Sequence, residues 1–390
     1  MTDVVIAGIG QKAVEEHWGL SLREMAFHAI EDAVRDASGL RPQALYVGNM
    51  LAPQLSRQAH LGALLADFAG LTGIEAVTVE AGGASGGAAL RAGYMAIASG
   101  LVDVALVLGV EKFSDTVGPE VDAALATAGD ADHEATQGLT PNAQAALLMR
   151  RYLHVYGVER QVFAGFPITA HANGVGNPNA MFRKAISAET YAKAGLVSDP
   201  LNMFDVAPNA DGAAALVLTR PGLLPPGLPH RLVRIAGSGM ATDTLALHDR
   251  PDPLEFKAAR QSIERACAKA RITPLQVDLF ELSDSYSIYA ALSLEAAGFA
   301  ARGEGWKLAQ NGSAPAAISL QGSLPIATFG GLKARGNPGG ATGVYQAVEA
   351  ALQLRGQAGK NQAPGARRAL VQSLGGPAST AVSHVLEALD

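Results

Sequence analysis

Residues 77–98 have the pattern of a strand, a tight turn and a helix, and this unit constrains the fold more than any other part of the chain. The β-branched run 77–79 is typical of a strand, and residues 88–98 have apolar side chains at helical spacing. A side chain at such a turn would lie beside the first unpaired N–H groups of the helix, which stabilise a thiolate or an oxyanion. The residue at the turn is Gly83, so the segment has the architecture for a nucleophile but no nucleophile.

Strand-like and helical segments alternate along the rest of the N-terminal region. Strands are expected at residues 4–7, 44–47 and 102–109, and helices at residues 21–34 and near 60–66. The strand at 102–109 is apolar throughout, as in a sheet covered on both faces. This alternation predicts an α/β fold.

The chain also shows two similar endings. Residues 211–219 and 375–386 each place glycine before a buried strand, and the Pro- and Gly-rich segment 221–229 separates them from one another. We interpret this as an internal duplication with an N-terminal half at 1–220 and a C-terminal half at 230–390.

Residues 114–201 interrupt the first half. Irregular stretches rich in glycine, asparagine and proline alternate there with isolated helices, such as the one expected at 141–156. We interpret this region as an insertion.

The composition excludes several classes of protein. A net charge of -6, with only 17% charged residues, argues against nucleic-acid binding, which needs clustered Lys and Arg. The single cysteine, Cys267, excludes an internal disulfide, and no Cys/His spacing suggests a metal site. Asp3 stands where a signal peptide would have bases, and no apolar run is long enough for a membrane span. We therefore expect a cytoplasmic protein.

Residues 79–90, which read V-E-A-G-G-A-S-G-G-A-A-L, resemble the nucleophile turn of the thiolase superfamily. The sterol-carrier-protein and archaeal-type branch reads V-E-A-A-C-A-S-G-G-A-A-L there, so only Gly82 and Gly83 differ. Residues 198–215 and 333–345 also match this branch, and the resemblance extends over nearly the whole chain. It implies a thiolase fold: two similar α/β halves stacked as α-β-α-β-α layers, with a first-half insertion that covers an acyl-CoA site.

The resemblance also marks the positions at which the family carries its reactive side chains. Gly83 stands in place of the acyl-accepting Cys, Asn337 in place of the His that activates it, and Ser283 in place of a His that helps to stabilise the enolate. Ser373 or Leu374 stands at the second Cys, which members of this branch often lack. A neutral amide cannot accept a proton at working pH, so Asn337 cannot replace the base. Concerted loss at these positions indicates that the usual thiolase chemistry is absent or severely impaired.

Two functions remain open. The first is an enzyme that acts on acyl-CoA carbon-carbon bonds by a Cys-independent route, with the backbone N–H groups of Gly83 and Gly375 as an oxyanion hole. The second is a non-catalytic thiolase-like subunit that supports an active partner. Either would bind coenzyme A as part of its ligand, with no other cofactor. The resemblance further implies a homodimer and a small zinc-ribbon/OB-fold protein as partner.

Other candidate residues have simpler explanations. Gly8 and Gly10 imitate a dinucleotide fingerprint, but a loop-like stretch follows them in place of a helix. His171 and Asn173 are candidates for the pocket cover or for a solvated turn.

Near the third motif, Tyr286, Tyr289 and Tyr345 are expected to be packing aromatics, and Asp284 is expected to stabilise its turn. The glycines at 82 and 83 either leave room for a bulkier acyl group or reflect drift in an inactive site.

Overall fold

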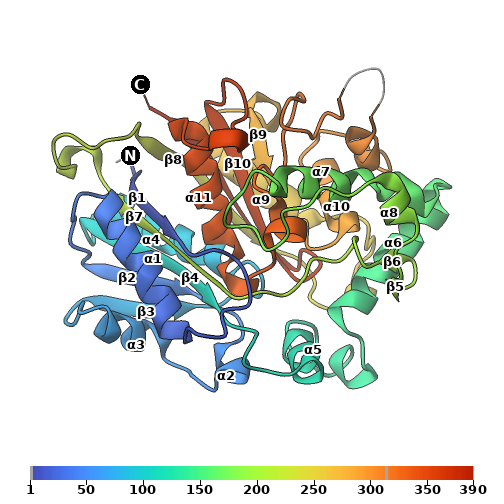
Figure 1. Ribbon diagram of the computed structural model, residues 1–390, viewed down its shortest axis with the longest axis horizontal. Coiled ribbons are helices and arrows are strands. Elements are labelled where there is room, and N and C mark those ends of the chain that lie inside the picture. Colours follow the sequence, from blue (N-terminus) through green and yellow to red (C-terminus); the bar gives the residue numbers. More distant parts are fainter. Residues whose placement is uncertain (1–2, 312–314, 390) are drawn as a thin grey trace.

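The structure is a computed structural model that describes residues 3–311 and 315–389. Its nine-stranded sheet has the order β3-β2-β4-β7-β1-β8-β11-β10-β9, and helices cover it (Figure 1). The N-terminal strands are β1 (Val5–Gln11), β2 (Ala44–Gly48), β3 (Glu75–Val79), β4 (Val104–Glu111) and β7 (Gly212–Thr219). The C-terminal strands are β8 (Val233–Thr242), β9 (Leu279–Glu281), β10 (Arg368–Gly375) and β11 (Thr380–Ala388).

The two groups of strands have the same arrangement. In the first, β7 lies antiparallel between β4 and β1; in the second, β11 lies antiparallel between β10 and β8. A short antiparallel pairing of β1 with β8 joins the groups.

Helices on three levels produce the layers. On one outer side lie α1 (Leu22–Asp36) and α3 (Leu61–Phe68), and on the other lie α9 (Lys257–Ala270) and α10 (Ser287–Ala296); the short helix α2 (Ala52–Leu55) follows β2. Between the halves, α4 (Ser85–Ser99) and α11 (Thr342–Arg355) contact each other and strands of both groups. This agrees with the layered α/β architecture that the resemblance implies.

Glycines allow the outer helices to pack closely on their strands. A Cβ atom at Gly8 or Gly10 of β1 would overlap carbonyl oxygens of α1. These glycines therefore allow the helix to pack closely on the strand, which accounts for them without a bound nucleotide. Gly237 and Gly239 of β8 stand in the same relation to α9. The second half thus repeats a detail of the first.

Residues between β4 and β7 form a mainly helical region, which lies beside the C-terminal half (Figure 1). It contains α5 (Gly118–Ala126), α6 (Pro141–Tyr156), α7 (Gly165–Gly174), α8 (Ala188–Ala192), β5 (Leu196–Ser198) and β6 (Leu201–Asn202). The expected helix at 141–156 is present as α6. Among the described residues, no helix has the length and apolar character needed to span a bilayer.

Candidate active site

The Gly83 turn joins β3 to α4, as expected from its sequence pattern. Gly82 has a φ of 59°, which glycine adopts without strain. The Ser85 hydroxyl accepts a hydrogen bond from the Ala81 N–H at 2.9 Å and donates one to the Gly82 carbonyl at 2.6 Å. Ser85, the first residue of α4, therefore connects the turn to the start of the helix.

The end of β10 packs directly against this turn. A Cβ atom at Gly83 would lie only 2.7 Å from the Leu374 carbonyl oxygen, and one at Gly82 would lie 3.3 Å from the Gly375 Cα. Both distances are shorter than an ordinary van der Waals contact. The sequence analysis allowed that the two glycines leave room for a bulkier acyl group. Beside Gly83 this is wrong, because the Leu374 backbone occupies the space that a side chain would fill.

Ser283 lies two residues after the end of β9 and is 4% exposed. Its hydroxyl accepts a hydrogen bond from the Leu374 N–H at 3.2 Å and donates one to the Gln372 carbonyl at 3.4 Å. The neighbouring Asp284 carboxylate accepts a hydrogen bond from the Leu332 N–H at 2.7 Å. Both side chains bind backbone of neighbouring segments, and for Asp284 this agrees with its expected role in the turn.

Asn337 stands in the turn that leads into α11. Its backbone N–H donates to the Pro208 carbonyl at 2.9 Å, and its carbonyl accepts from the Ala210 N–H at 3.1 Å. The side-chain oxygen accepts a hydrogen bond from the Thr342 hydroxyl at 3.3 Å. The amide group of Asn337 is thus oriented while its Nδ2 donors remain for another partner.

Glu111, the last residue of β4, supports this turn from below. Its buried carboxylate accepts hydrogen bonds from the N–H groups of Met50, Leu51 and Gly340 at 2.9, 3.1 and 3.0 Å, and from the Asn49 amide at 2.8 Å. Burial raises the pKa of Glu111 to about 7. The sequence analysis missed this residue; its signal was an acid at the end of an apolar strand.

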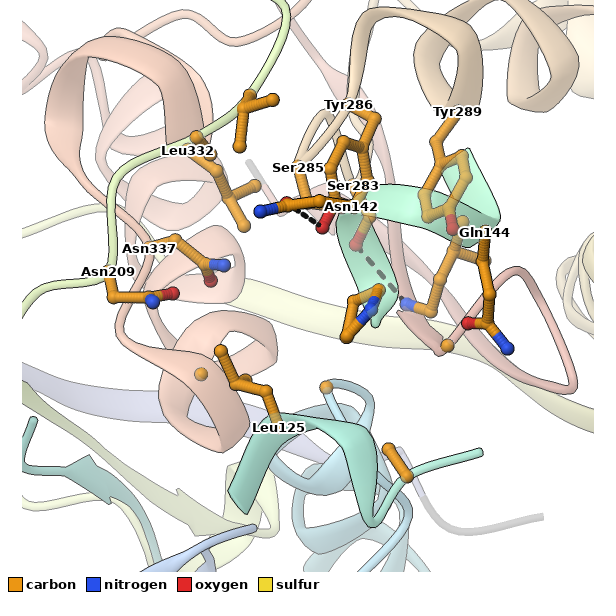
Figure 2. Close-up of a pocket in the computed structure, with 18 of the residues that line it drawn as sticks. Leu125, Asn142, Gln144, Asn209, Ser283, Ser285, Tyr286, Tyr289, Leu332 and Asn337 are labelled. Carbon is orange, nitrogen blue, oxygen red and sulfur yellow. Dashed lines mark hydrogen bonds between the residues drawn. The ribbon is translucent and has the colours of Figure 1, made fainter. Parts of the chain in front are cut away.

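These segments surround one pocket of about 150 Å³ (Figure 2). Gly83, Ser283 and Asn337 all line it, although 54 residues or more separate them in sequence. Gly375 is not a lining residue, but its neighbours Leu374 and Gly376 are. The other lining residues are Met50, Asp122, Leu125, Ala126, Ala128, Gly129, Leu139, Pro141, Asn142, Gln144, Val206, Ala207, Asn209, Ser285, Tyr286, Tyr289, Leu332, Gly339 and Thr342.

Comparisons with known proteins agree with this arrangement. The family model described as "Thiolase, N-terminal domain" matches residues 4–221, and "Thiolase C-terminal domain-like" matches residues 239–388. This chain belongs to the thiolase family.

Several thiolase relatives are similar over most of the chain. An acetyl-CoA acetyltransferase of Methanothermobacter thermautotrophicus is 40% identical over 387 residues, which are 99% of either chain. Sterol carrier protein 2 of Oryctolagus cuniculus is 30% identical, covering 78% of this chain and 57% of that protein.

Solved structures show the same fold. One described as "Ltp2-ChsH2(DUF35) aldolase" has a TM-score of 0.82 at 23% identity and covers 99% of this chain and 98% of its own. A monomeric SCP2-thiolase-like protein of Mycobacterium smegmatis has a TM-score of 0.72 at 20% identity and covers 98% of this chain and 76% of its own.

The described lining of this pocket has few ionisable side chains. Of the described residues that line it, none is a cysteine or a histidine, and Asp122 is the one carboxylate. His384, behind α4, donates from Nε2 to the Gly87 carbonyl at 3.1 Å, and burial lowers its pKa to about 4. It is therefore a neutral buried residue outside the pocket.

Two other candidates also lie outside the pocket. The His171 ring stacks on Phe182 with a centroid distance of 6.1 Å, and the Asn173 amide donates to the Ala327 carbonyl at 3.0 Å. Neither residue lines the cavity. In the described part of the chain, no cluster of three or more His, Cys, Asp or Glu side chains could hold a metal.

The tyrosines divide between packing and pocket. Tyr345 donates to the Lys12 and Ala213 carbonyls at 2.8 and 3.0 Å and is buried away from the cavity. Tyr286 and Tyr289 line the pocket, and their rings meet edge to face at 4.8 Å. The sequence analysis assigned both to packing; Tyr286 is the residue before α10, and Tyr289 lies in the first turn of that helix.

Proposed function

We propose that this chain binds an acyl-CoA in the pocket between its halves and does not perform thiolysis through an acyl-cysteine. The observation that carries the proposal is the convergence of Gly83, Ser283 and Asn337 on one cavity with no thiol or imidazole among the described lining residues. In a serine protease, loss of the nucleophile or its base costs about 10⁶ in kcat. The acetyltransferase name of the archaeal relatives therefore does not transfer with the fold.

If the protein is catalytic, helix dipoles and backbone N–H donors would have to stabilise the charge that develops in the reaction. The N-termini of α4 and α11 begin at Ser85 and Thr342, next to the turns of Gly83 and Asn337, and both present positive dipole ends. With the N–H group of Gly83, they would stabilise an oxyanion on a thioester; Gly375, the second expected donor, does not line the pocket. Cleavage or formation of an acyl-CoA carbon-carbon bond is the reaction class that this arrangement supports.

The alternative is a non-catalytic subunit. It is favoured by the lack of a buried base: Asp122, the one carboxylate among the described lining residues, is exposed. A protein partner would then supply the chemistry. A small zinc-ribbon/OB-fold protein is our candidate, since the similar aldolase structure is described with a DUF35 component.

A second copy of the chain is the other proposed partner. Strand β3 is an edge of the nine-stranded sheet, and its Val77 side chain is 49% exposed. Unpaired edge strands with apolar side chains are suited to pairing with another chain.

Two measurements test the main proposal. Purified protein should not thiolyse acetoacetyl-CoA above the rate of a protein-free control, and calorimetry should detect binding of CoA. Robust thiolysis would refute the loss of thiolase chemistry. No binding of CoA or its thioesters would refute the acyl-CoA ligand and leave the subunit role alone.

A further inference from the structure

Neutral polar side chains gather at the end of the pocket opposite Asn337. Figure 2 shows Asn209 and Asn337 on one side of the cavity and Tyr289 and Gln144 on the other. Tyr289 projects from α10 and Gln144 from α6, so this far end is formed where the insertion meets the C-terminal half.

The far end contains hydrogen-bonding groups without partners in the protein. Tyr289 is 3% exposed and Gln144 is 5% exposed. Neither the Tyr289 hydroxyl nor the Gln144 side-chain amide forms a hydrogen bond with any residue in the described ranges. Both groups are open to the cavity, and a ligand that displaced water from them without offering a hydrogen bond would leave them unsatisfied. A bound ligand would supply the missing partner.

The neighbouring Tyr286 differs in this respect. Its hydroxyl donates to the Asn142 side-chain oxygen at 2.8 Å (Figure 2). This hydrogen bond leaves the Asn142 Nδ2 group as a further donor toward the cavity. Donors and acceptors are thus both available at the far end.

The charged side chains near the far end are one cation and one anion, and both are bound to other parts of the protein. The charged groups that act on Tyr289 are Arg250 and Glu134. The Arg250 guanidinium donates to the Pro377 carbonyl at 2.6 Å, and the Glu134 carboxylate accepts from the Leu247 N–H at 2.8 Å. Both are engaged by their own chain.

Asp122 adds to this preference. It is the one Asp or Glu among the described lining residues, and no Lys or Arg is among them. A carboxylate on the ligand would meet repulsion and no compensating cation.

We infer that the acyl group carries an uncharged oxygen function, a hydroxyl or carbonyl, at its distal end, which hydrogen-bonds to Tyr289 and Gln144. A hydrocarbon end would leave both groups without a hydrogen bond, and a carboxylate end would find no Lys or Arg among the described lining residues. This inference rests on the proposed acyl-CoA ligand and specifies its chemical class.

The test compares thioesters that differ only at the distal end. Calorimetry measures the binding of free CoA, hexanoyl-CoA, 6-hydroxyhexanoyl-CoA and adipoyl-CoA, and of the shorter series valeryl-CoA, 5-hydroxyvaleryl-CoA and glutaryl-CoA. We expect the hydroxyl compound of at least one series to bind about tenfold more tightly than its hydrocarbon analogue, with the carboxylate compound weakest.

Two variants connect this preference with the residues. Tyr289→Phe and Gln144→Leu should each reduce the preference for hydroxyl over hydrocarbon to about twofold or less, because each removes a hydrogen-bonding group. Tyr94→Phe, which removes a buried hydroxyl outside the pocket, is the matched control and should keep the preference. Thermal unfolding checks that each variant is folded.

The outcomes separate this inference from the proposed function. If CoA and its thioesters all fail to bind, both are wrong. Should they bind with no hydroxyl preference in either series, or with a carboxylate preference, only the distal-oxygen inference is overturned. The wild-type comparison decides this even if a variant fails to fold.

Discussion

Gly83 and Leu374 meet with no room for a side chain between them: a Cβ atom at Gly83 would lie 2.7 Å from the Leu374 carbonyl oxygen. The family resemblance implies a nucleophile at the position of the first residue, and the second residue lies near the end of β10. Backbone of the C-terminal half therefore occupies the space into which a side chain at position 83 would project. Any side chain at position 83 would therefore require a change in the packing of the two halves.

Restoring the cysteine should therefore not restore thiolysis. We expect Gly83→Cys to lower stability by about 1–3 kcal/mol, because the Leu374 peptide must move to admit the side chain. Gly83→Cys combined with Asn337→His should remain inactive with acetoacetyl-CoA. Thermal unfolding and a thiolysis assay measure both effects.

Gly195→Cys is the matched control, since nothing lies within 4 Å of a Cβ atom at that exposed position. Its stability should equal that of the unmodified chain. An active double variant with unchanged stability would contradict the closed site.

Glu111 should be important for stability and for the position of Asn337. In Glu111→Gln the new amide group would face backbone N–H donors at Met50 or Gly340, so two donors would oppose each other. We expect a loss of about 1–3 kcal/mol in the free energy of unfolding and weaker binding of CoA thioesters. Denaturant unfolding and calorimetry measure the two effects; unchanged values for both would refute this role.

Glu281 should make stability depend on pH. Burial, with a contribution from Glu349, raises its pKa from 4.5 to about 8 in the folded chain. Between these values the unfolded chain releases the proton and the folded chain retains it, so this contribution is complete below about pH 4.5 and is lost as the pH rises through about 8. The stability of wild type relative to Glu281→Gln should therefore fall over this range in thermal unfolding. A constant difference would contradict the assignment.

Gly10 should be required for packing and irrelevant to nucleotides. A Cβ atom there would overlap the Ala29 carbonyl of α1, so Gly10→Ala should destabilise the protein by about 1–3 kcal/mol. Gly19→Ala, where a Cβ atom meets nothing within 4 Å, should be nearly neutral. Chemical denaturation compares the two, and tight NAD binding by wild type that Gly10→Ala abolishes would refute the packing role.

The proposed dimer predicts a specific effect at β3. Wild type should behave as a dimer in light scattering, and Val77→Lys should shift it toward monomer, because a lysine would oppose edge-to-edge pairing. Leu275→Lys changes a more exposed apolar side chain, 68% against 49% for Val77, away from this edge and should leave the dimer intact. A monomeric wild type would overturn the proposal.

Much of the fold could be predicted because it depends on local patterns. The run 77–79 followed by small residues and a helical segment is present as β3, the Gly83 turn and α4. The expected strand at 102–109 is observed as β4 (Val104–Glu111), since an apolar run of this length suits a strand covered on both faces. The positions of Gly83, Ser283 and Asn337 in one pocket followed from the family resemblance, which already contains the family's tertiary arrangement.

Other features of the site depend on distances between segments remote in sequence. Tyr289 and Gln144 are 145 residues apart, and no local pattern brings α10 beside α6. The sequence by itself determined that position 83 has no thiol and position 337 no imidazole, because side-chain chemistry is inherent in residue identity. Only the tertiary structure decided that Leu374 fills the space beside Gly83 and that neutral hydrogen-bonding groups form the far end, because long-range packing places one backbone against another.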